Sequence, residues 1–372
     1  MKVPLLDLEA QHAPIRSELE AAVGRVLDSN HYIMGGEVQA FEKAAADRLE
    51  AAHAIGVSSG TDALLVSLMA LEVGPGDEVL CPSFTFFATA GCVSRLGAVP
   101  VFVDVRKEDF QIDVEDAAKK VTGRTKAVIP VHLFGQSADM GAVMELAGEH
   151  GLKVVEDCAQ SMGAKWNGKE TGTIGDLGTV SFFPAKNLGG FGDGGLVVTN
   201  DGDLAERVRV LRVHGSKPKY FHSLVGGNFR LDALQAALLG VKLGHLDTYL
   251  SKRRDNAAYY QAQFKEHGGA LEGKVVFPAE NPGCHHTWNQ FTLRVLGGKR
   301  DALREHLKSE GIASVVYYPK GLHEQECFAG LPPQACPATE QLAGEVLSLP
   351  VYPEIQRGMQ DGVVSAVTGF LA

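Results

Sequence analysis

Short apolar segments alternate with helical patterns through the first two-thirds of the chain, and this alternation restricts the fold more than any other feature. The segments expected as strands are residues 54–57, 78–81, 100–103, 126–132, 152–156, 179–183 and 196–199. Helices are expected between them, most clearly over residues 61–71 and 140–150. Continuous apolar strands that alternate with helices form a mostly parallel sheet with helices on both faces. The sequence therefore predicts an α/β fold.

The pattern changes after Asn228. One apolar stripe typical of a long helix is formed there by Leu231, Leu234, Leu238 and Val241. Beyond residue 250, strands are expected near residues 290–295 and 313–317, and helices near 299–310 and 340–347. Because 372 residues exceed one ordinary core, the sequence predicts a large domain over residues 1–250 and a smaller α+β domain over residues 251–372.

Charge and hydropathy argue against two classes of protein. The formal net charge of −10 disfavours a nucleic-acid surface, which needs clustered Lys and Arg. The longest mostly apolar stretch, residues 63–73, is far shorter than the roughly 20 residues that cross a bilayer. The N-terminus has no signal-peptide pattern, and none of the six cysteines forms a C-x-x-C pair. We therefore expect a cytoplasmic protein that binds neither nucleic acid nor membranes.

A turn of small and polar residues, from Ser58 to Leu64, separates the first predicted strand from the helix that follows. Free backbone N–H groups at a helix N-terminus favour an anion, and Thr61 adds a hydroxyl donor. The same residues also suit an ordinary helix cap. The turn alone does not distinguish a phosphate site from a capped helix.

Two acidic residues, Glu156 and Asp157, end an apolar strand that we expect to be buried. Ligands of open α/β sheets bind at the carboxyl ends of the strands, and a buried carboxylate needs a partner. A protonated pyridine nitrogen is one suitable partner for Asp157. A helix cap made by Asp157 explains this segment about equally well.

Lys186 lies in the most informative segment, directly after an apolar strand and before five glycines between residues 189 and 195. A lysine that binds a cofactor aldehyde needs a short, rigid approach and free space, which small residues provide. Ser181 adds a hydroxyl suited to a phosphate. A surface lysine in a glycine-rich loop is the alternative. A P-loop is excluded because no suitable glycine precedes Lys186, and the glycines do not fit a dinucleotide-binding fingerprint.

In this order, the three segments resemble the DegT/DnrJ/EryC1/StrS family of sugar aminotransferases, which are fold-type I pyridoxal-phosphate enzymes. The resemblance covers nearly the whole chain. It rests on further motifs that read YIMG, PSFTF, PVHLFG, GNFRLD, YYP and LSLP, at residues 32–35, 82–86, 130–135, 227–232, 317–319 and 347–350. It implies a mostly parallel sheet sandwiched by helices, with a smaller C-terminal α+β domain.

The resemblance assigns roles position by position. Lys186 matches the lysine that binds pyridoxal 5'-phosphate covalently, and Asp157 matches the partner of the pyridine nitrogen. The other matching cofactor contacts are Phe86 stacked on the ring, Gln160 at the phenolic oxygen, and the phosphate ligands Gly60, Thr61, Ser181 and Asn228. Asn228 matches a residue that reaches the phosphate from a neighbouring subunit. The resemblance therefore implies a homodimer with shared active sites.

The implied reaction moves an amino group from L-glutamate to a nucleotide-linked keto sugar, for surface polysaccharide, lipopolysaccharide or related amino sugars. Residues 186–195 look like those of members that aminate C-3, because the C-4 group shows Thr-x-Gly-Glu-Gly-Gly there. Candidate substrate neighbours are His31, Tyr32, Arg230, Tyr317 and His323. The alternatives are an ion pair of Arg230 with Asp232, and packing of Tyr317 and His323 at the domain interface.

Two other functions remain open within the same fold. Members that act as sugar dehydratases carry histidine in place of Lys186, so its presence favours transamination. A non-catalytic regulator would need neither Lys186 nor Asp157. Met162 departs from the histidine that many members carry, which affects local polarity alone. Residues 284–286, Cys-His-His, lack metal-ligand spacing, so no metal is expected.

Overall fold

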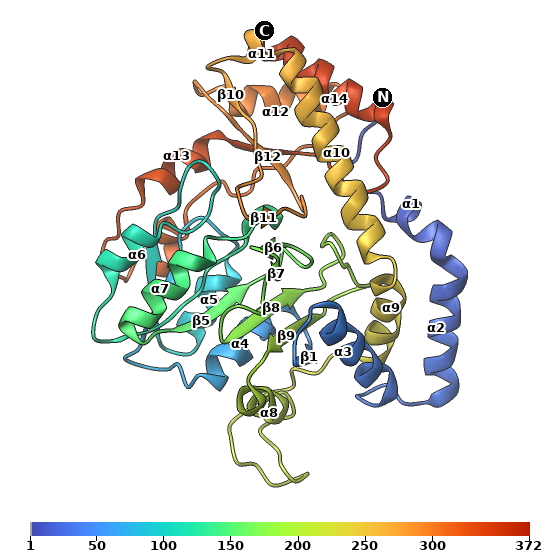
Figure 1. Ribbon diagram of the computed structural model, residues 1–372, viewed down its shortest axis with the longest axis vertical. Helices are drawn as coiled ribbons and strands as arrows, with labels where there is room; N and C mark the ends of the chain where they lie inside the picture. Colours follow the sequence, from blue (N-terminus) through green and yellow to red (C-terminus); the bar gives the residue numbers. More distant parts are fainter. Residues whose placement is uncertain (1) are drawn as a thin grey trace.

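The computed structural model describes residues 2–372, and it contains a central seven-stranded sheet with strand order β1–β9–β8–β5–β4–β2–β3 (Figure 1). The strands are β1 (His53–Val57), β2 (Glu78–Pro82), β3 (Val99–Val103), β4 (Thr125–Val128), β5 (Lys153–Asp157), β8 (Leu177–Ser181) and β9 (Gly195–Thr199). Strands β3, β2, β4, β5 and β8 pair in parallel. Only β9 runs against both of its neighbours in this sheet. The predicted mostly parallel sheet is confirmed.

Helices cover both faces of this sheet because alternate side chains of each strand point to opposite faces. Val57, Val79 and Val155 face α4 (Gly60–Ala70), α5 (Ala88–Arg95) and α8 (Gly202–Leu211). The other face is covered by α2 (Arg16–Ser29), α3 (Gly36–Arg48), α6 (Val114–Lys120), α7 (Met140–His150) and α9 (Ala233–Leu243). The strands are therefore apolar on both sides, as their sequences indicate.

The C-terminal part is smaller and built around an antiparallel sheet of order β10–β12–β13. Its elements are β10 (Val275–Val276), β12 (Phe291–Val295), β13 (Val346–Leu349), α11 (Gly268–Leu271), α12 (Arg300–Ser309), α13 (Pro337–Glu345) and α14 (Arg357–Leu371). Val3 joins this part through a bridge to Ile312, ahead of α1 (Leu8–His12). A third small sheet, β11–β6–β7, links Cys284–His285 to Lys165–Trp166 and Lys169–Glu170.

Helix α10 (Leu246–Glu266) runs as one long helix from α9, beside the central sheet, to α11, beside the small sheet (Figure 1). The expected domain division at residue 250 falls near the start of this helix. Tyr260 and Phe264, further along α10, pack in the core of the C-terminal part. Of the helices in residues 2–372, none combines the length and apolar composition that crossing a membrane requires.

Three predicted elements have different bounds. The strand predicted over residues 126–132 ends at Val128, and Pro130, which has no N–H, lies beyond it. The strand predicted near 313–317 is wrong, because Val315 makes only an isolated bridge to Ser348. The helix predicted over residues 340–347 ends at Glu345, since Val346–Leu349 pairs with β12 instead.

Candidate active site

The segments that follow β1, β2, β5 and β8 meet at one edge of the central sheet. Strands β2, β5 and β8 run in the same direction. Strand β1 runs in that direction too, because β1 and β8 are both antiparallel partners of β9. This carboxyl edge is where ligands of open α/β sheets bind. It collects the segments that the sequence singles out, around Gly60, Phe86, Asp157 and Lys186.

Asp157 ends β5 with a buried carboxylate. Its Oδ2 accepts a hydrogen bond from Thr89 Oγ1 at 2.9 Å, and its Oδ1 accepts one from the Ala159 N–H at 3.1 Å. Burial raises the pKa of Asp157, while these bonds and the nearby Lys186 charge oppose the rise. No basic side chain of residues 2–372 forms an ion pair with it. The carboxylate therefore has room for a further cationic donor.

Lys186 lies in the turn after β8, where its backbone N–H donates to the Phe183 carbonyl at 2.8 Å. Burial lowers the pKa of its amine to about 8, against the opposing effect of the Asp157 charge. The next residue, Asn187, is buried and donates to Thr287 Oγ1 at 2.9 Å. The neutral, nucleophilic form of the Lys186 amine is therefore more accessible near neutral pH than in an exposed lysine, and it lies on an anchored loop.

Gly60 and Ser181 lie side by side at the start of α4. A Cβ added to Gly60 would lie 2.6 Å from the Ser181 Cβ and 3.0 Å from its Oγ, so no larger residue fits there. Ser59 caps the helix, since its hydroxyl accepts from the Asp62 N–H at 3.0 Å. Thr61 is exposed in the first turn. The helix cap at Ser59 and the residues expected to bind a phosphate, Gly60, Thr61 and Ser181, are therefore different residues, and the two predictions are compatible.

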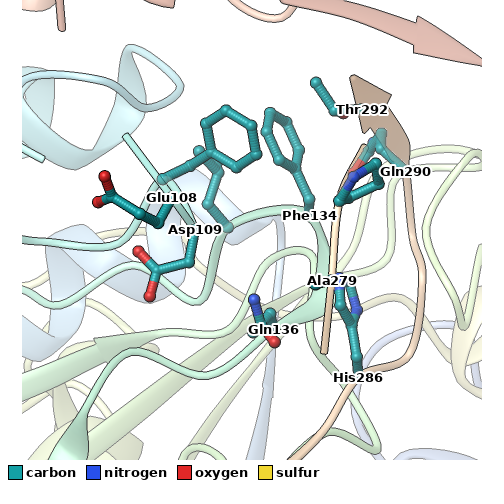
Figure 2. A pocket seen from close by; sticks show the side chains of 11 residues that line it. Glu108, Asp109, Phe134, Gln136, Ala279, His286, Gln290 and Thr292 are labelled. Atoms are coloured by element: carbon teal, nitrogen blue, oxygen red, sulfur yellow. The ribbon is translucent and has the colours of Figure 1, made fainter. Parts of the chain in front are cut away.

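Gln160 is held in one orientation by two partners. Its Oε1 accepts from the Phe134 N–H at 2.7 Å, and its Nε2 donates to Tyr318 Oη at 3.2 Å. Phe134 has a left-handed backbone (φ 61°) and its carbonyl accepts from the Gln290 N–H at 3.3 Å. Figure 2 shows Phe134 beside Gln290 and Thr292 in a pocket between the two parts of the chain. The remaining Nε2 hydrogen of Gln160 is free to donate to a ligand.

Phe86 lies just before α5, with 57% of its side chain exposed. Its carbonyl accepts from the Thr89 N–H at 3.3 Å, and Thr89 in turn donates to Asp157. The exposed Phe86 ring is therefore available as an apolar surface for a flat ligand, and its backbone is linked to Asp157 through Thr89. The sequence did not indicate Thr89, although its position, three residues after Phe86, was a usable signal.

Arg230 adjoins the turn after β1, because it forms a bridge with Val57 and the preceding carbonyl accepts from the Ser58 N–H at 3.0 Å. Its Nε is buried without a hydrogen-bond partner. Within residues 2–372 it forms no ion pair with Asp232. Asn228, two residues earlier, is exposed and bridges to Val213.

The remaining candidate substrate residues lie in different surroundings. Tyr317 lines a cavity together with Ala185. His323 has both ring nitrogens engaged, with Ser83 Oγ at 2.6 Å and Glu340 Oε1 at 3.3 Å. Tyr32 and His31 are exposed residues after α2, and His31 lines a separate surface cavity formed by α2 and α3. The carboxyl edge thus brings Tyr317 close to the Lys186 loop but not His31.

His132, Glu156 and Cys158 form a buried cluster in which one potential metal-ligating atom of each lies within 4.8 Å of the others. His132 Nδ1 accepts from the Ala138 N–H, so its Nε2–H donates to Glu156 Oε2 at 2.9 Å. Glu156 also accepts from the N–H groups of residues 172, 174 and 175. The potential ligand atoms are thus already engaged in hydrogen bonds, as donors at His132 Nε2 and Cys158 Sγ and as acceptors at Glu156, which makes the cluster a structural clamp behind Asp157.

Comparison with known proteins gives a family match over residues 14–368, to the DegT/DnrJ/EryC1/StrS aminotransferase family. The chain is 48% identical over 372 residues to a protein of Geobacillus stearothermophilus named pleiotropic regulatory protein, covering 100% of this chain and 99% of the relative. It is 46% identical over 354 residues to UDP-N-acetyl-3-dehydro-alpha-D-glucosamine 3-aminotransferase of Acidithiobacillus ferrooxidans, covering 95% and 94% of the two chains.

Solved structures have the same fold over the whole chain. DesV of S. venezuelae, in complex with a ketimine intermediate, matches with a TM-score of 0.93 and 43% identity, covering 100% of this chain and 98% of that one. NtdA of Bacillus subtilis, with bound cofactor PMP, matches with a TM-score of 0.91 and 31% identity, covering 100% and 85% of the two chains.

Proposed function

The chain belongs to the DegT/DnrJ/EryC1/StrS aminotransferase family, and on that premise we propose that it moves an amino group from L-glutamate to the C-3 keto position of a nucleotide-linked sugar. Pyridoxal 5'-phosphate is the proposed carrier. The names of the A. ferrooxidans relative and of several others with 3-amino or 3-oxo sugars support the C-3 position. The product would enter surface polysaccharide, lipopolysaccharide or related amino-sugar synthesis.

The residues at the carboxyl edge fit this cofactor. Gly60 has no side chain, so its backbone is open to a phosphate. A Cβ at this position would meet Ser181. The buried Asp157 carboxylate is without a cationic side chain in ion-pair contact among the described residues, although burial of a charge is costly. A pyridinium N–H would supply that missing charge. The observation that carries the proposal is that Asp157 and Lys186, whose pKa is lowered by burial, lie at the same edge of the sheet.

When bound, the cofactor ring accepts the electron pair of the donor Cα–H bond and so carries the amino group between the two substrates. Lys186 Nζ is the proposed base that takes the Cα proton and returns it on the cofactor side. Its pKa of about 8 suits both directions, because neither protonation state dominates completely near neutral pH. The anchored loop around Asn187 keeps the amine in place for this transfer.

Asp157 and Gln160 are proposed to set the charge of the ring. The Asp157 carboxylate would accept a hydrogen bond from the protonated pyridine nitrogen, with Thr89 and Ala159 holding its oxygens in position. Gln160 would donate from Nε2 to the phenolic oxygen, because the Phe134 N–H already occupies its carbonyl oxygen. Both residues thereby favour electron withdrawal toward the ring.

The other cofactor contacts are proposed to hold the phosphate and the ring face. The N-terminus of α4 with Gly60 and Thr61, together with Ser181, binds the phosphate. Phe86 stacks on the ring. We also propose that Asn228 completes the phosphate site of a second subunit, which suits its exposure here, so that the working form is a homodimer.

The proposed substrate contacts are Arg230, Tyr317 and His323, together with Tyr32 and His31, of which His31 lines a separate cavity in this subunit and would have to act in the site of the second subunit. Arg230 suits a carboxylate of the donor because its Nε is buried without a partner. His323 would act through its present bonds to Ser83 and Glu340, unless substrate displaces one of them.

An absorption spectrum of the purified protein, recorded before and after adding L-glutamate without acceptor, tests this function. A pyridoxal-type band that converts to a pyridoxamine-type band is expected. UDP- and dTDP-linked 3-keto and 4-keto sugars are then screened for the reverse conversion, and a preference for 4-keto sugars would contradict the C-3 assignment.

One relative is named a regulatory protein, so a non-catalytic role is the second candidate. That role is favoured if the protein shows no cofactor band even after incubation with pyridoxal phosphate. A bound cofactor that L-glutamate leaves unchanged, with loss of a sugar hydroxyl on turnover, would instead favour the dehydratase.

A further inference from the structure

A second cavity, of about 50 Å³, lies beside the Lys186 loop. Its lining includes Leu5, Ala185, Arg253, Asn289, Gln290 and Tyr317, from the N-terminal segment, the loop after β8, α10, the segment just before β12 and the segment between α12 and α13. A single water needs roughly 10–15 Å³ measured this way, so the space admits a small polar group. Ala185 directly precedes Lys186, so the cavity adjoins the proposed site. We call it the Arg253 cavity.

Arg253 is buried, with 4% of its surface exposed, and only one of its three nitrogens is engaged. Its Nη1 donates to the carbonyls of Trp288 and Asn289, each at 3.2 Å. Its Nε is buried without a partner, and no hydrogen bond from Nη2 is found within residues 2–372. Nε and Nη2 form one edge of the guanidinium, and this fork matches the two oxygens of a carboxylate.

No acidic side chain of the described residues forms an ion pair with Arg253. The charge of Glu354 acts on Arg253 from beyond ion-pair distance, and burial raises the pKa of Glu354 itself. The adjacent Arg254, in contrast, pairs with Glu280 at 2.8 Å. Because an unpaired buried charge is costly, Arg253 lacks an anion that the chain itself does not supply.

Two unpaired acceptors lie in the same lining. Asn289 Nδ2 donates to Asn187 Oδ1 at 3.0 Å, which leaves Asn289 Oδ1 as the free end of the amide. Gln290 Oε1 is also buried without a partner. The guanidinium edge of Arg253 and the two oxygen acceptors together complement a molecule that carries a carboxylate and an ammonium group.

We propose that the Arg253 cavity binds a carboxylate of the amino donor through the Nε–Nη2 edge of Arg253. Asn289 Oδ1 and Gln290 Oε1 accept hydrogen bonds from the ammonium group of the donor. This inference rests on the proposed function, since it assigns a subsite to the donor of that reaction. It is compatible with a donor contact at Arg230, because L-glutamate has two carboxylates. A sugar hydroxyl would not neutralise the Arg253 charge, so the keto sugar is not the ligand of this subsite.

The test measures the two half-reactions of the holoenzyme separately. The first is followed by the cofactor absorbance with L-glutamate alone, and the second with the pyridoxamine form and a keto sugar. Arg253→Gln should raise the L-glutamate concentration for half-maximal rate by roughly thirtyfold or more, because it removes one partner of a buried charged pair. The keto-sugar dependence should stay unchanged. Arg254→Gln is the matched control on the same helix and should change neither half-reaction.

Glutarate, a dicarboxylate without an amino group, gives a readout independent of turnover. Calorimetry should show that it binds wild-type holoenzyme and the Arg254→Gln variant but not Arg253→Gln. If Arg253→Gln fails to fold, Arg253→Lys replaces it, since it keeps the charge but loses the fork and should also weaken glutarate binding.

The inference is overturned if L-glutamate and glutarate act on the Arg253 variants as on wild type, or if both half-reactions weaken equally. Failure of the proposed function has a different signature. In that case L-glutamate leaves the wild-type spectrum unchanged, whereas glutarate binding still reports on the subsite.

Discussion

Thr89 and Asp157 are 68 residues apart in the chain, yet Thr89 Oγ1 donates to Asp157 Oδ2 over 2.9 Å. The bond joins the first turn of α5 to the end of β5, and it fixes the carboxylate rotamer. The Phe86 carbonyl accepts from the same Thr89, so the proposed stacking ring and the proposed pyridine partner are held by one residue. Thr89 is therefore a positioning residue whose removal should be measurable.

Replacing Thr89 with Val should slow turnover by about tenfold, since a hydrogen bond to a charged group contributes about 1.5 kcal/mol. Asp157→Asn, which removes the charge itself, should lower turnover by about a hundredfold or more. Steady-state kinetics with L-glutamate and a keto sugar measure both effects. Thr85→Val is the control, because Thr85 touches Thr89 but not Asp157. Equal rates for Thr89→Val and Thr85→Val would show that the bond is unimportant.

Covalent capture of pyridoxal phosphate by cofactor-free protein should depend on pH through Lys186. Because burial lowers the pKa of this amine from 10.5 to about 8, the neutral nucleophilic form accumulates as the pH rises through 8. The capture rate, followed by absorbance, should be half-maximal near pH 8. A half-maximal rate near pH 10.5 would contradict the buried environment. Lys186→Ala should keep its fold by circular dichroism yet show neither capture nor turnover.

Gly60→Ala should weaken cofactor binding by about tenfold or more, because the new Cβ meets Ser181 at 2.6 Å and pushes apart the proposed phosphate cradle. Equilibrium dialysis or fluorescence titration with pyridoxal phosphate measures the dissociation constant. Gly148→Ala is the control, since nothing lies within 4 Å of its Cβ position. Unchanged affinity in Gly60→Ala would place the phosphate elsewhere.

Asn228 can be tested by mixing subunits. Lys186→Ala and Asn228→Ala homodimers should each be nearly inactive, but random mixing should restore about a quarter of the wild-type sites, because each mixed dimer regains one intact site. Activity after denaturation and joint refolding is compared with that of the separately refolded variants. Mixtures without regained activity would argue that Asn228 serves its own subunit.

Glu156→Gln should destabilise the chain by about 3 kcal/mol, as expected when one partner of a buried pair is removed. Burial alone would raise the pKa of Glu156, but His132 and three backbone N–H groups lower it below 4.5. The folded chain therefore binds fewer protons than the unfolded chain, and this contribution disappears in acid. Urea unfolding should show the difference from wild type shrinking below pH 4.5. Glu149→Gln, on exposed α7 surface, is the control.

The central strands could be predicted because their residues are apolar on both faces, as Val154 and Val155 illustrate. Helix α10 was not predicted as a separate element because polar side chains occupy its buried face. Arg253 and Asn256 are both buried there, so the apolar period is interrupted. Tertiary hydrogen bonds to backbone carbonyls, rather than hydrophobicity, place these residues inside.

The site could be predicted only where a residue type itself points to chemistry. Lys186 and Asp157 are a lysine and a carboxylate at strand ends, and such residues are unusual in a core. Phe134 and Tyr318, which orient Gln160, carried no comparable signal. Phe134 acts through its backbone N–H, which every residue except proline possesses, so its role depends on the path of the chain rather than on its side chain.

The last two residues of β5 are both acidic but point to opposite faces of the sheet. Glu156 is clamped by His132, whereas Asp157 is held by Thr89 from α5. Insertion or deletion of one residue within β5 would exchange these two carboxylates without changing the composition of the strand. A change in the length of β5 would therefore displace Asp157 from Thr89 even if every residue type at this edge were kept.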